Sequence, residues 1–148
     1  MHEKQAAASI GQIQLSQQWQ KAFAKFNIQS SQILITAEDL NERRKYLNIR
    51  NTIYSLMDLN VVPIINENDT TSTEEIRFGD NDKLSAMIAN ALSAELLILL
   101  SDVNGLYTAN PKKSTDAELI TSVEEVDQEI EKYIDKDLSE FGSGGMLA

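Results

Sequence analysis

The sequence contains no cysteine and a single histidine, His2. Without thiols the chain can form neither a disulfide nor a thiolate metal site, and it has no cysteine nucleophile. One terminal histidine also leaves no Ser-His-Asp triad and no multi-histidine zinc site. Any chemistry must therefore use carboxylates, amides, lysines, backbone N–H groups or a bound metal. The lack of cysteine is typical of a reducing cytosol, so we expect a cytoplasmic location.

Long apolar runs and an excess of basic charge are also absent. No run approaches the ~18 apolar residues of a membrane span, and residues 1–11 contain no apolar signal core. The chain carries 13 basic and 23 acidic residues, a net charge of −10. Because nucleic-acid surfaces need clustered lysine and arginine, we expect neither a nucleic acid nor a membrane as partner. A length of 148 residues suits one domain with a real core.

Apolar periodicity predicts an alternation of helices and strands. Apolar residues three and four apart indicate helices, and short continuous apolar runs indicate buried strands. The expected elements are, in chain order, helix 3–27, strand 32–36, helix 37–59, strand 61–65, helix 82–93, strand 96–100 and a helix from 122. This alternation favours an α/β domain with a mostly parallel sheet and helices on its faces.

The first expected helix carries an aromatic stripe that we predict to lie in the core. Its members are Leu15, Trp19, Ala22, Phe23 and Phe26. Thr36 and Asp39 match a capping box before the second helix, and Ser122 and Glu125 match one before the last. Pro63 is a conflict, because proline lacks the N–H donor of a central strand. Its apolar neighbours still favour a strand.

Three polar clusters follow or lie near the ends of predicted strands. They are residues 66–69 with Asn81 and Asp82, then Ser101 with Asp102, and then the glycine-rich residues 142–145. Each could be an ordinary turn, a helix cap or a flexible end. Ligands of open α/β sheets, however, bind outside the carboxyl ends of the strands. Taken together, the clusters therefore indicate a ligand site.

Familiar binding loops do not fit these clusters. A calcium loop that began at Asp69 would place Glu74 where a glycine is required. The P-loop pattern is absent, and the glycine-rich tail does not follow a strand and open a helix as a dinucleotide loop would. Residues 142–145 could still form a nest of N–H groups for a phosphate.

Longer strings resemble the glutamate-phosphorylating branch of the amino-acid kinase family. They are PIINEND, STEEIRFGDNDKLSA, LLSDVNGLYTANP and FGSGGM, in that order and spacing. INEND followed by FGDND is specific to that branch, whereas SDVNGLY with a later GGM is shared more widely among amino-acid kinases. The resemblance covers essentially the whole chain. It implies a three-layer αβα sandwich around a mainly parallel open sheet.

The activity implied by the resemblance is phosphorylation of the L-glutamate side-chain carboxylate by ATP and Mg²⁺. The product is γ-glutamyl phosphate, the first intermediate of proline biosynthesis. The resemblance also implies a homo-oligomer that proline inhibits by feedback. Two alternatives stay open: a non-catalytic module that binds proline or glutamate for regulation, and the kinase portion of a bifunctional pyrroline-5-carboxylate synthase.

The resemblance also implies roles for individual residues. Asp69 and Asn81 match glutamate-binding positions, and Asp82 matches an acidic residue that orients catalytic lysines. The positions that match the nucleotide side are Ser101, Asp102, Ser143, Gly144, Gly145 and Met146. The family's opening strand with its glycine loop and lysine would precede Met1, and a second lysine would follow the GGM loop. We therefore expect residues 1–148 to be a partial kinase domain, inactive alone and prone to self-association through unpaired sheet edges.

Overall fold

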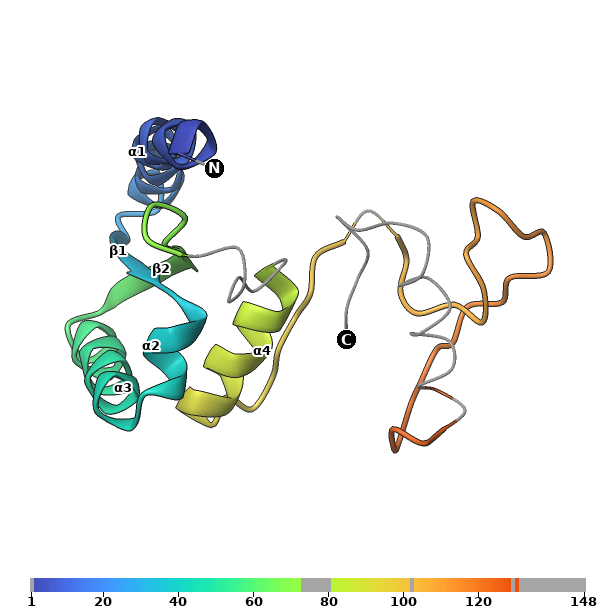
Figure 1. Ribbon diagram of the computed structural model, residues 1–148. Helices are drawn as coiled ribbons and strands as arrows, with labels where there is room; N and C mark the ends of the chain where they lie inside the picture. Colours follow the sequence, from blue (N-terminus) through green and yellow to red (C-terminus); the bar gives the residue numbers. More distant parts are fainter. Residues whose placement is uncertain (1, 73–80, 102, 129, 131–148) are drawn as a thin grey trace. The chain divides into compact units, whose positions relative to one another are not determined.

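The computed structural model describes residues 2–72, 81–101, 103–128 and 130 of the chain. The chain divides into two compact units, Met1–Glu95 and Leu96–Ala148. The named helices and strands all belong to the first unit (Figure 1): α1 (His2–Ala24), β1 (Gln29–Ile35), α2 (Ala37–Asn41), α3 (Arg43–Asp58), β2 (Val61–Glu67) and α4 (Asn81–Leu92).

The two strands of the first unit form a parallel pair. Gln29 lies opposite Val61, and the register continues in step until Ile35 lies opposite Glu67. Parallel strands cannot be joined by a tight turn, so α2 and α3 carry the chain from the end of β1 back to the start of β2. The parallel open sheet predicted from the sequence is confirmed. Pro63 lies inside β2, where each described strand has a single described partner, and such an edge position tolerates a missing N–H donor.

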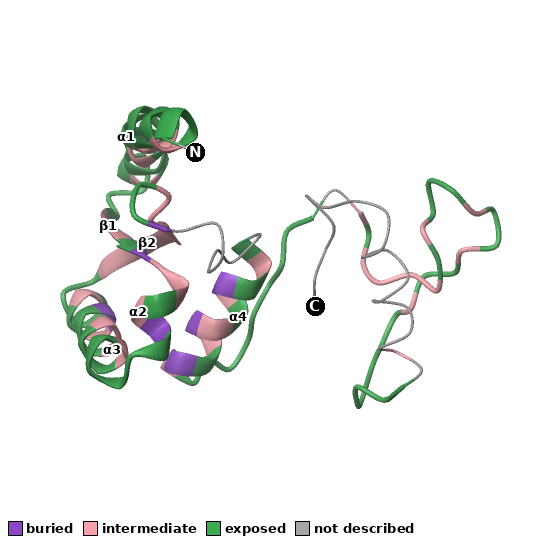
Figure 2. Cartoon of the chain, viewed as in Figure 1, coloured by how far each residue is buried: buried purple, intermediate pink, exposed green. Residues whose placement is uncertain are grey.

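The core of the first unit lies on one face of this sheet. Ile33 and Ile35 point to that face together with Ile65, because alternate residues of a strand share a face. Helices α2, α3 and α4 cover it (Figure 1). The buried side chains of this core (Figure 2) are Ile35, Leu40, Ile53, Leu84 and Ile88. The apolar stripe predicted within residues 82–93 is thereby confirmed. The stripe predicted within residues 37–59 is confirmed at Ile53, which is fully enclosed, but not at Met57, which is 51% exposed.

The single helix expected over residues 37–59 is interrupted at Glu42. This residue has an extended backbone, with φ −85° and ψ 114°, so α2 ends before it and α3 begins after it. The capping box at the start of α2 is confirmed. Asp39 donates its N–H to Thr36 Oγ1 at 3.3 Å, and Thr36 donates its N–H to Asp39 Oδ2 at 2.9 Å. Two donors at the helix start are satisfied in this way.

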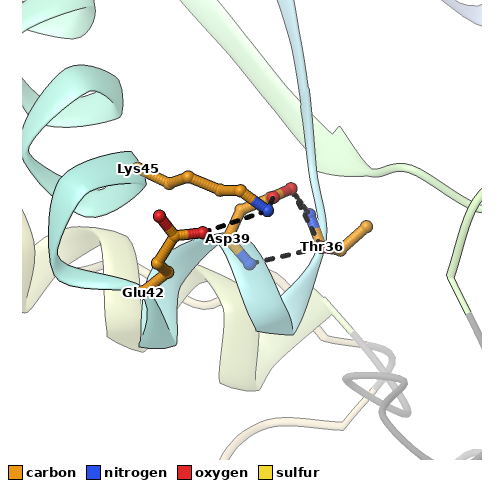
Figure 3. A network of polar contacts seen from close by, with 4 residues as sticks. All are labelled: Thr36, Asp39, Glu42 and Lys45. Carbon is orange, nitrogen blue, oxygen red and sulfur yellow. Dashed lines mark hydrogen bonds and ion pairs between the residues drawn. The ribbon is translucent and has the colours of Figure 1, made fainter.

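A lysine from α3 bridges the break between the two helices. Lys45 Nζ lies 3.1 Å from Asp39 Oδ1 and 3.3 Å from Glu42 Oε2 (Figure 3). Partial burial raises the pKa of Asp39, but the N–H and hydroxyl of Thr36 and the Lys45 ammonium outweigh this effect. The pKa of Asp39 therefore lies below its ordinary value of 3.8. Hydrogen bonds to Asp39 and Glu42 raise the pKa of Lys45.

Helix α1 packs on the opposite face of the sheet, through side chains of which periodicity indicated only Phe23. Asn66 contacts α1, and it neighbours Ile65, which points to the core face, so α1 must lie on the other side. The half-buried side chains of α1 recur at helical spacing: Gln5, Ala8, Gln12, Ser16 and Phe23. These are mostly small or polar residues.

The aromatic stripe predicted to lie in the core does not do so. Helix α1 contains no buried residue. Leu15 and Trp19 are each 44% exposed and Phe26 is 74% exposed, while the Trp19 and Phe23 rings stack on each other at 6.0 Å. Helical periodicity identifies an apolar face, but burial also needs a surface to cover it. The described part of the first unit offers that surface to the polar face of α1 instead.

In the second unit, the prediction of a strand over residues 96–100 is wrong. The run has no strand structure, and Ile98 and Leu100 are 69% and 94% exposed. Strand backbone needs a hydrogen-bonded partner, and no strand in the described residues pairs with this run. Among the described residues of this unit, an isolated antiparallel bridge pairs Tyr107 with Leu119. Hydrogen bonds from Thr108 N–H to the Glu118 carbonyl oxygen, 3.0 Å, and from Ile120 N–H to the Leu106 carbonyl oxygen, 2.8 Å, flank it.

The last helix begins later than predicted. Residues 122–127 are not helical, whereas residues 128 and 130 are. Ile130 donates its N–H to Asp127 Oδ1 at 3.0 Å, so Asp127 takes the capping position predicted for Ser122. None of the helices in the described ranges is both long and apolar enough to cross a membrane.

Candidate functional site

The loop after β2 carries Asp69, the first residue of the predicted site. Asn68 donates its backbone N–H to the carbonyl of Ile35, at the end of β1, at 2.8 Å. The Asn68 carbonyl in turn accepts the N–H groups of Thr71 and Ser72, at 3.1 and 3.0 Å. Asp69 therefore lies within a closed turn that is bonded to the carboxyl end of the neighbouring strand. This is the edge at which α/β sheets bind ligands.

Side-chain contacts hold the same turn together. The Thr70 hydroxyl donates to Asn68 Oδ1 at 2.5 Å, and Ser72 is buried with 5% exposure. Asp69 is half-buried and lies in the sequence between Asn68 and Ser72. A carboxylate on a backbone anchored in this way can accept hydrogen bonds from an ammonium group without reordering its loop.

Two glutamines of α1 contact this segment, and the sequence analysis missed both. Gln12 Oε1 accepts a hydrogen bond from Asn66 Nδ2 at 2.9 Å. Gln5 Nε2 donates to the Ser72 carbonyl oxygen at 3.3 Å. A spacing of seven residues places the two glutamines on one helix face, two turns apart. That spacing was the only available signal, and it is equally typical of a solvated face.

The second part of the predicted site lies at the start of α4. Asn81 is the first helical residue and is exposed, and Asp82 follows it and is half-buried. The Ser85 hydroxyl donates to the Asp82 carbonyl oxygen at 2.7 Å. Leu84 fixes this first turn, because it is buried in the same core as Ile35. The turn that holds Asp69 and the start of α4 are thus both anchored to the end of β1. A pocket shared by Asp69 and Asn81 stays a prediction.

The predicted nucleotide side belongs to the second unit. Ser101 is exposed, and its Oγ accepts the Val103 N–H at 3.4 Å. The turn that follows requires glycine, since Gly105 has φ +147° and an added Cβ would come within 3.3 Å of Leu119 Cδ1. The other predicted nucleotide residues lie outside the described residues: Asp102, Ser143, Gly144, Gly145 and Met146. Their roles stay predictions.

The described residues contain no cluster of three or more histidine, aspartate or glutamate side chains that could hold a metal ion. Magnesium needs few protein ligands where it binds with a nucleotide, because phosphate oxygens and water supply most of its coordination. One or two carboxylates therefore suffice for such a site.

The two parallel strands are joined by a helical crossover, and polar residues follow their carboxyl ends. This arrangement is typical of α/β proteins that bind ligands at that edge of the sheet. Comparison with known protein families narrows this class. Residues 1–148 match the amino acid kinase family, and the chain belongs to that family. The predicted family membership is confirmed, and with it the αβα architecture of which the described unit is a part.

Individual relatives are similar along nearly the whole chain. The chain is 50% identical to a glutamate 5-kinase of Nitrosospira multiformis over 147 residues, which is 99% of the chain and 40% of that protein. It is 51% identical to a glutamate 5-kinase of Rhodopseudomonas palustris (strain BisB5) and 47% identical to one of Pseudomonas aeruginosa (strain PAO1), each over 146 residues. Those matches cover 99% of the chain and 39% of each protein. The chain thus spans about two fifths of the length of these relatives.

Proposed function

We propose that this chain is the glutamate-binding part of a glutamate 5-kinase. The complete enzyme would transfer the γ-phosphate of ATP to the side-chain carboxylate of L-glutamate, and so make γ-glutamyl phosphate for proline biosynthesis. The observation that carries this proposal is the identity of about 50% to proteins named glutamate 5-kinase along 99% of the chain. That similarity spans both the turn that holds Asp69 and the start of α4.

The proposed contacts follow from the chemistry of the substrate. Glutamate presents an α-ammonium group that needs acceptors and an α-carboxylate that needs donors. Asp69 supplies a carboxylate for the former, and the Asn81 amide supplies N–H donors for the latter. Asp82, one residue further along α4, would orient catalytic lysines. Anchoring of both segments to one core supports their acting together.

On the nucleotide side, we propose contacts from Ser101 and Asp102 and from the loop formed by residues 143–146.

In the reaction a γ-carboxylate oxygen of glutamate bonds to the γ-phosphorus of ATP. The bond from that phosphorus to the β–γ bridging oxygen breaks, and ADP leaves with the electron pair. Phosphoryl transfer depends mainly on positioning and on positive charge around the transferring group. We propose that Mg-ATP is the substrate form, because a chain of net charge −10 supplies little positive charge itself.

The share of the relatives that the chain covers supports a further part of the proposal. Residues 1–148 would form part of a kinase domain, and its remaining residues would supply the phosphate-contacting lysines. The isolated chain would then bind substrate without turnover. We also propose that the complete enzyme is a cytoplasmic homo-oligomer inhibited by proline, as the resemblance implies.

Substitutions in the complete enzyme test this function. Asp69→Ala and Asn81→Ala should each raise the KM for glutamate by roughly 10- to 150-fold, because each removes a hydrogen bond to a charged group. The KM for ATP should stay unchanged. Asp58→Ala and Asn51→Ala are matched controls, since both residues are exposed on α3. An unchanged glutamate KM in both test variants would contradict the assignments, and absence of glutamate phosphorylation by the wild type would contradict the function.

A further inference from the structure

Asp69 lies at the centre of a segment that α1 holds at both ends. Asn66 precedes Asp69 by three residues and bonds to Gln12, and Ser72 follows it by three residues and bonds to Gln5. The two glutamines are seven residues apart on one helix face. The spacing of two helical turns on α1 thus matches the span of the segment that contains Asp69.

These bonds belong to the face by which α1 meets the sheet. Gln5 and Gln12 are half-buried, as are Ala8 between them and Ser16 one turn later. The helix has no fully buried residue, and of its half-buried side chains only Ala8 and Phe23 are apolar. Hydrogen bonds from a partly buried polar face fix direction and register more strictly than apolar contacts, which are non-directional. The glutamines therefore set where α1 and the segment lie relative to each other.

We infer that Gln5 and Gln12 are positioning residues for the amino-acid substrate: they act through segment 66–72 to hold Asp69 in its binding geometry. The inference rests on the proposed function, and it adds α1 to the elements that determine glutamate affinity. Neither glutamine has to touch the substrate. Gln12 acts on the end of β2 before the turn, and Gln5 acts on the Ser72 carbonyl after it.

The two bonds should contribute unequally. The bond from Asn66 to Gln12 is 2.9 Å long and joins two side chains that are both half-buried, so its loss leaves an amide without its partner. The bond from Gln5 to the Ser72 carbonyl is longer, at 3.3 Å. We therefore expect Gln12 to matter more than Gln5.

The test is steady-state kinetics of the complete enzyme with glutamate and ATP varied separately. Gln12→Leu should raise the KM for glutamate about three- to tenfold while the KM for ATP stays within twofold of the wild type. Gln5→Leu should give a smaller rise in the same direction. Gln12→Glu keeps an oxygen acceptor for Asn66 and should retain most of the glutamate affinity. Gln14→Leu is the matched control, because Gln14 is exposed on the same helix.

The outcomes separate this inference from the function on which it rests. A wild type without glutamate phosphorylation overturns both. An active wild type in which Gln12→Leu and Gln14→Leu have the same glutamate KM overturns the inference alone. A parallel rise of both KM values in Gln12→Leu, with a lowered Tm, indicates general destabilisation and also overturns it. Should Gln12→Leu not fold, Gln5→Leu decides by the same criterion.

Discussion

An apolar stripe was predicted for both α1 and α4, yet only the stripe of α4 is buried. The apolar stripe of α4 enters the core, where Leu84 is 3% exposed and Ile88 is 9% exposed. The apolar side chains of α1 stay accessible, and Ile10 and Ile13 are 66% and 62% exposed. What differs is the surface each helix meets. Helix α4 covers the apolar face of the sheet, whereas α1 meets the other face through glutamines and small residues.

The largest loss of stability is expected from a large-to-small substitution in the core that α3 and α4 cover. Ile53→Ala should reduce the free energy of unfolding by about 2–5 kcal/mol, because Ile53 is fully enclosed and its loss leaves a cavity. Denaturant unfolding followed by circular dichroism measures the change. A loss below about 0.5 kcal/mol, the range typical of surface substitutions, would mean that this core does not hold the unit together.

An intermediate effect is expected where α2 meets α3. Asp39→Asn removes the charge that Lys45 and Thr36 stabilise and should cost about 1 kcal/mol at neutral pH. The folded-state pKa of Asp39 lies below 3.8, so its ionised form stabilises the fold at pH values above 3.8. That contribution is lost as the pH falls through the folded-state pKa.

The stability difference between wild type and Asp39→Asn should therefore be constant near neutral pH and shrink below pH 3.8. Glu38→Gln is the control, since Glu38 is exposed on the same helix. Unfolding curves recorded between pH 7 and the acid limit of folding measure the difference. A gap that widens as the pH falls would contradict the lowered pKa.

The smallest effect on stability is expected on α1. Ile10→Ser and Ile13→Ser should each change the free energy of unfolding by less than about 0.5 kcal/mol, because both side chains are already accessible to water. The same changes should reduce self-association of the isolated chain, since exposed apolar side chains favour it. Sedimentation of the double variant against wild type measures this. A large loss of stability would show that α1 buries its apolar face.

Sequence reasoning succeeded where periodicity and local chemistry act within one segment. The capping box of Thr36 and Asp39, the buried Ile53 and the first turn of α4 all follow from nearby residues. It failed where the outcome depends on a distant surface. Residues 96–100 are as apolar as a buried strand, but no described strand pairs with them, and no residue of α1 is fully buried.

The residues of the candidate site also differ in whether local sequence indicates them. Asp69, Asn81 and Asp82 were predicted from their places after a strand and at a helix start and from the family resemblance, and their roles stay predictions. Gln5 and Gln12 were missed, because a glutamine at helical spacing does not reveal which of its faces meets the sheet. Only the packing of α1 brings them within hydrogen-bond distance of segment 66–72.

Calorimetric titration of the 148-residue chain with L-glutamate tests most directly whether the turn after β2 binds the substrate. Wild-type chain should bind glutamate, and Asp69→Ala should weaken that binding at least about tenfold, since a contact to a charged group is lost. Equal affinity in the two proteins would contradict the assignment of this turn to the glutamate site.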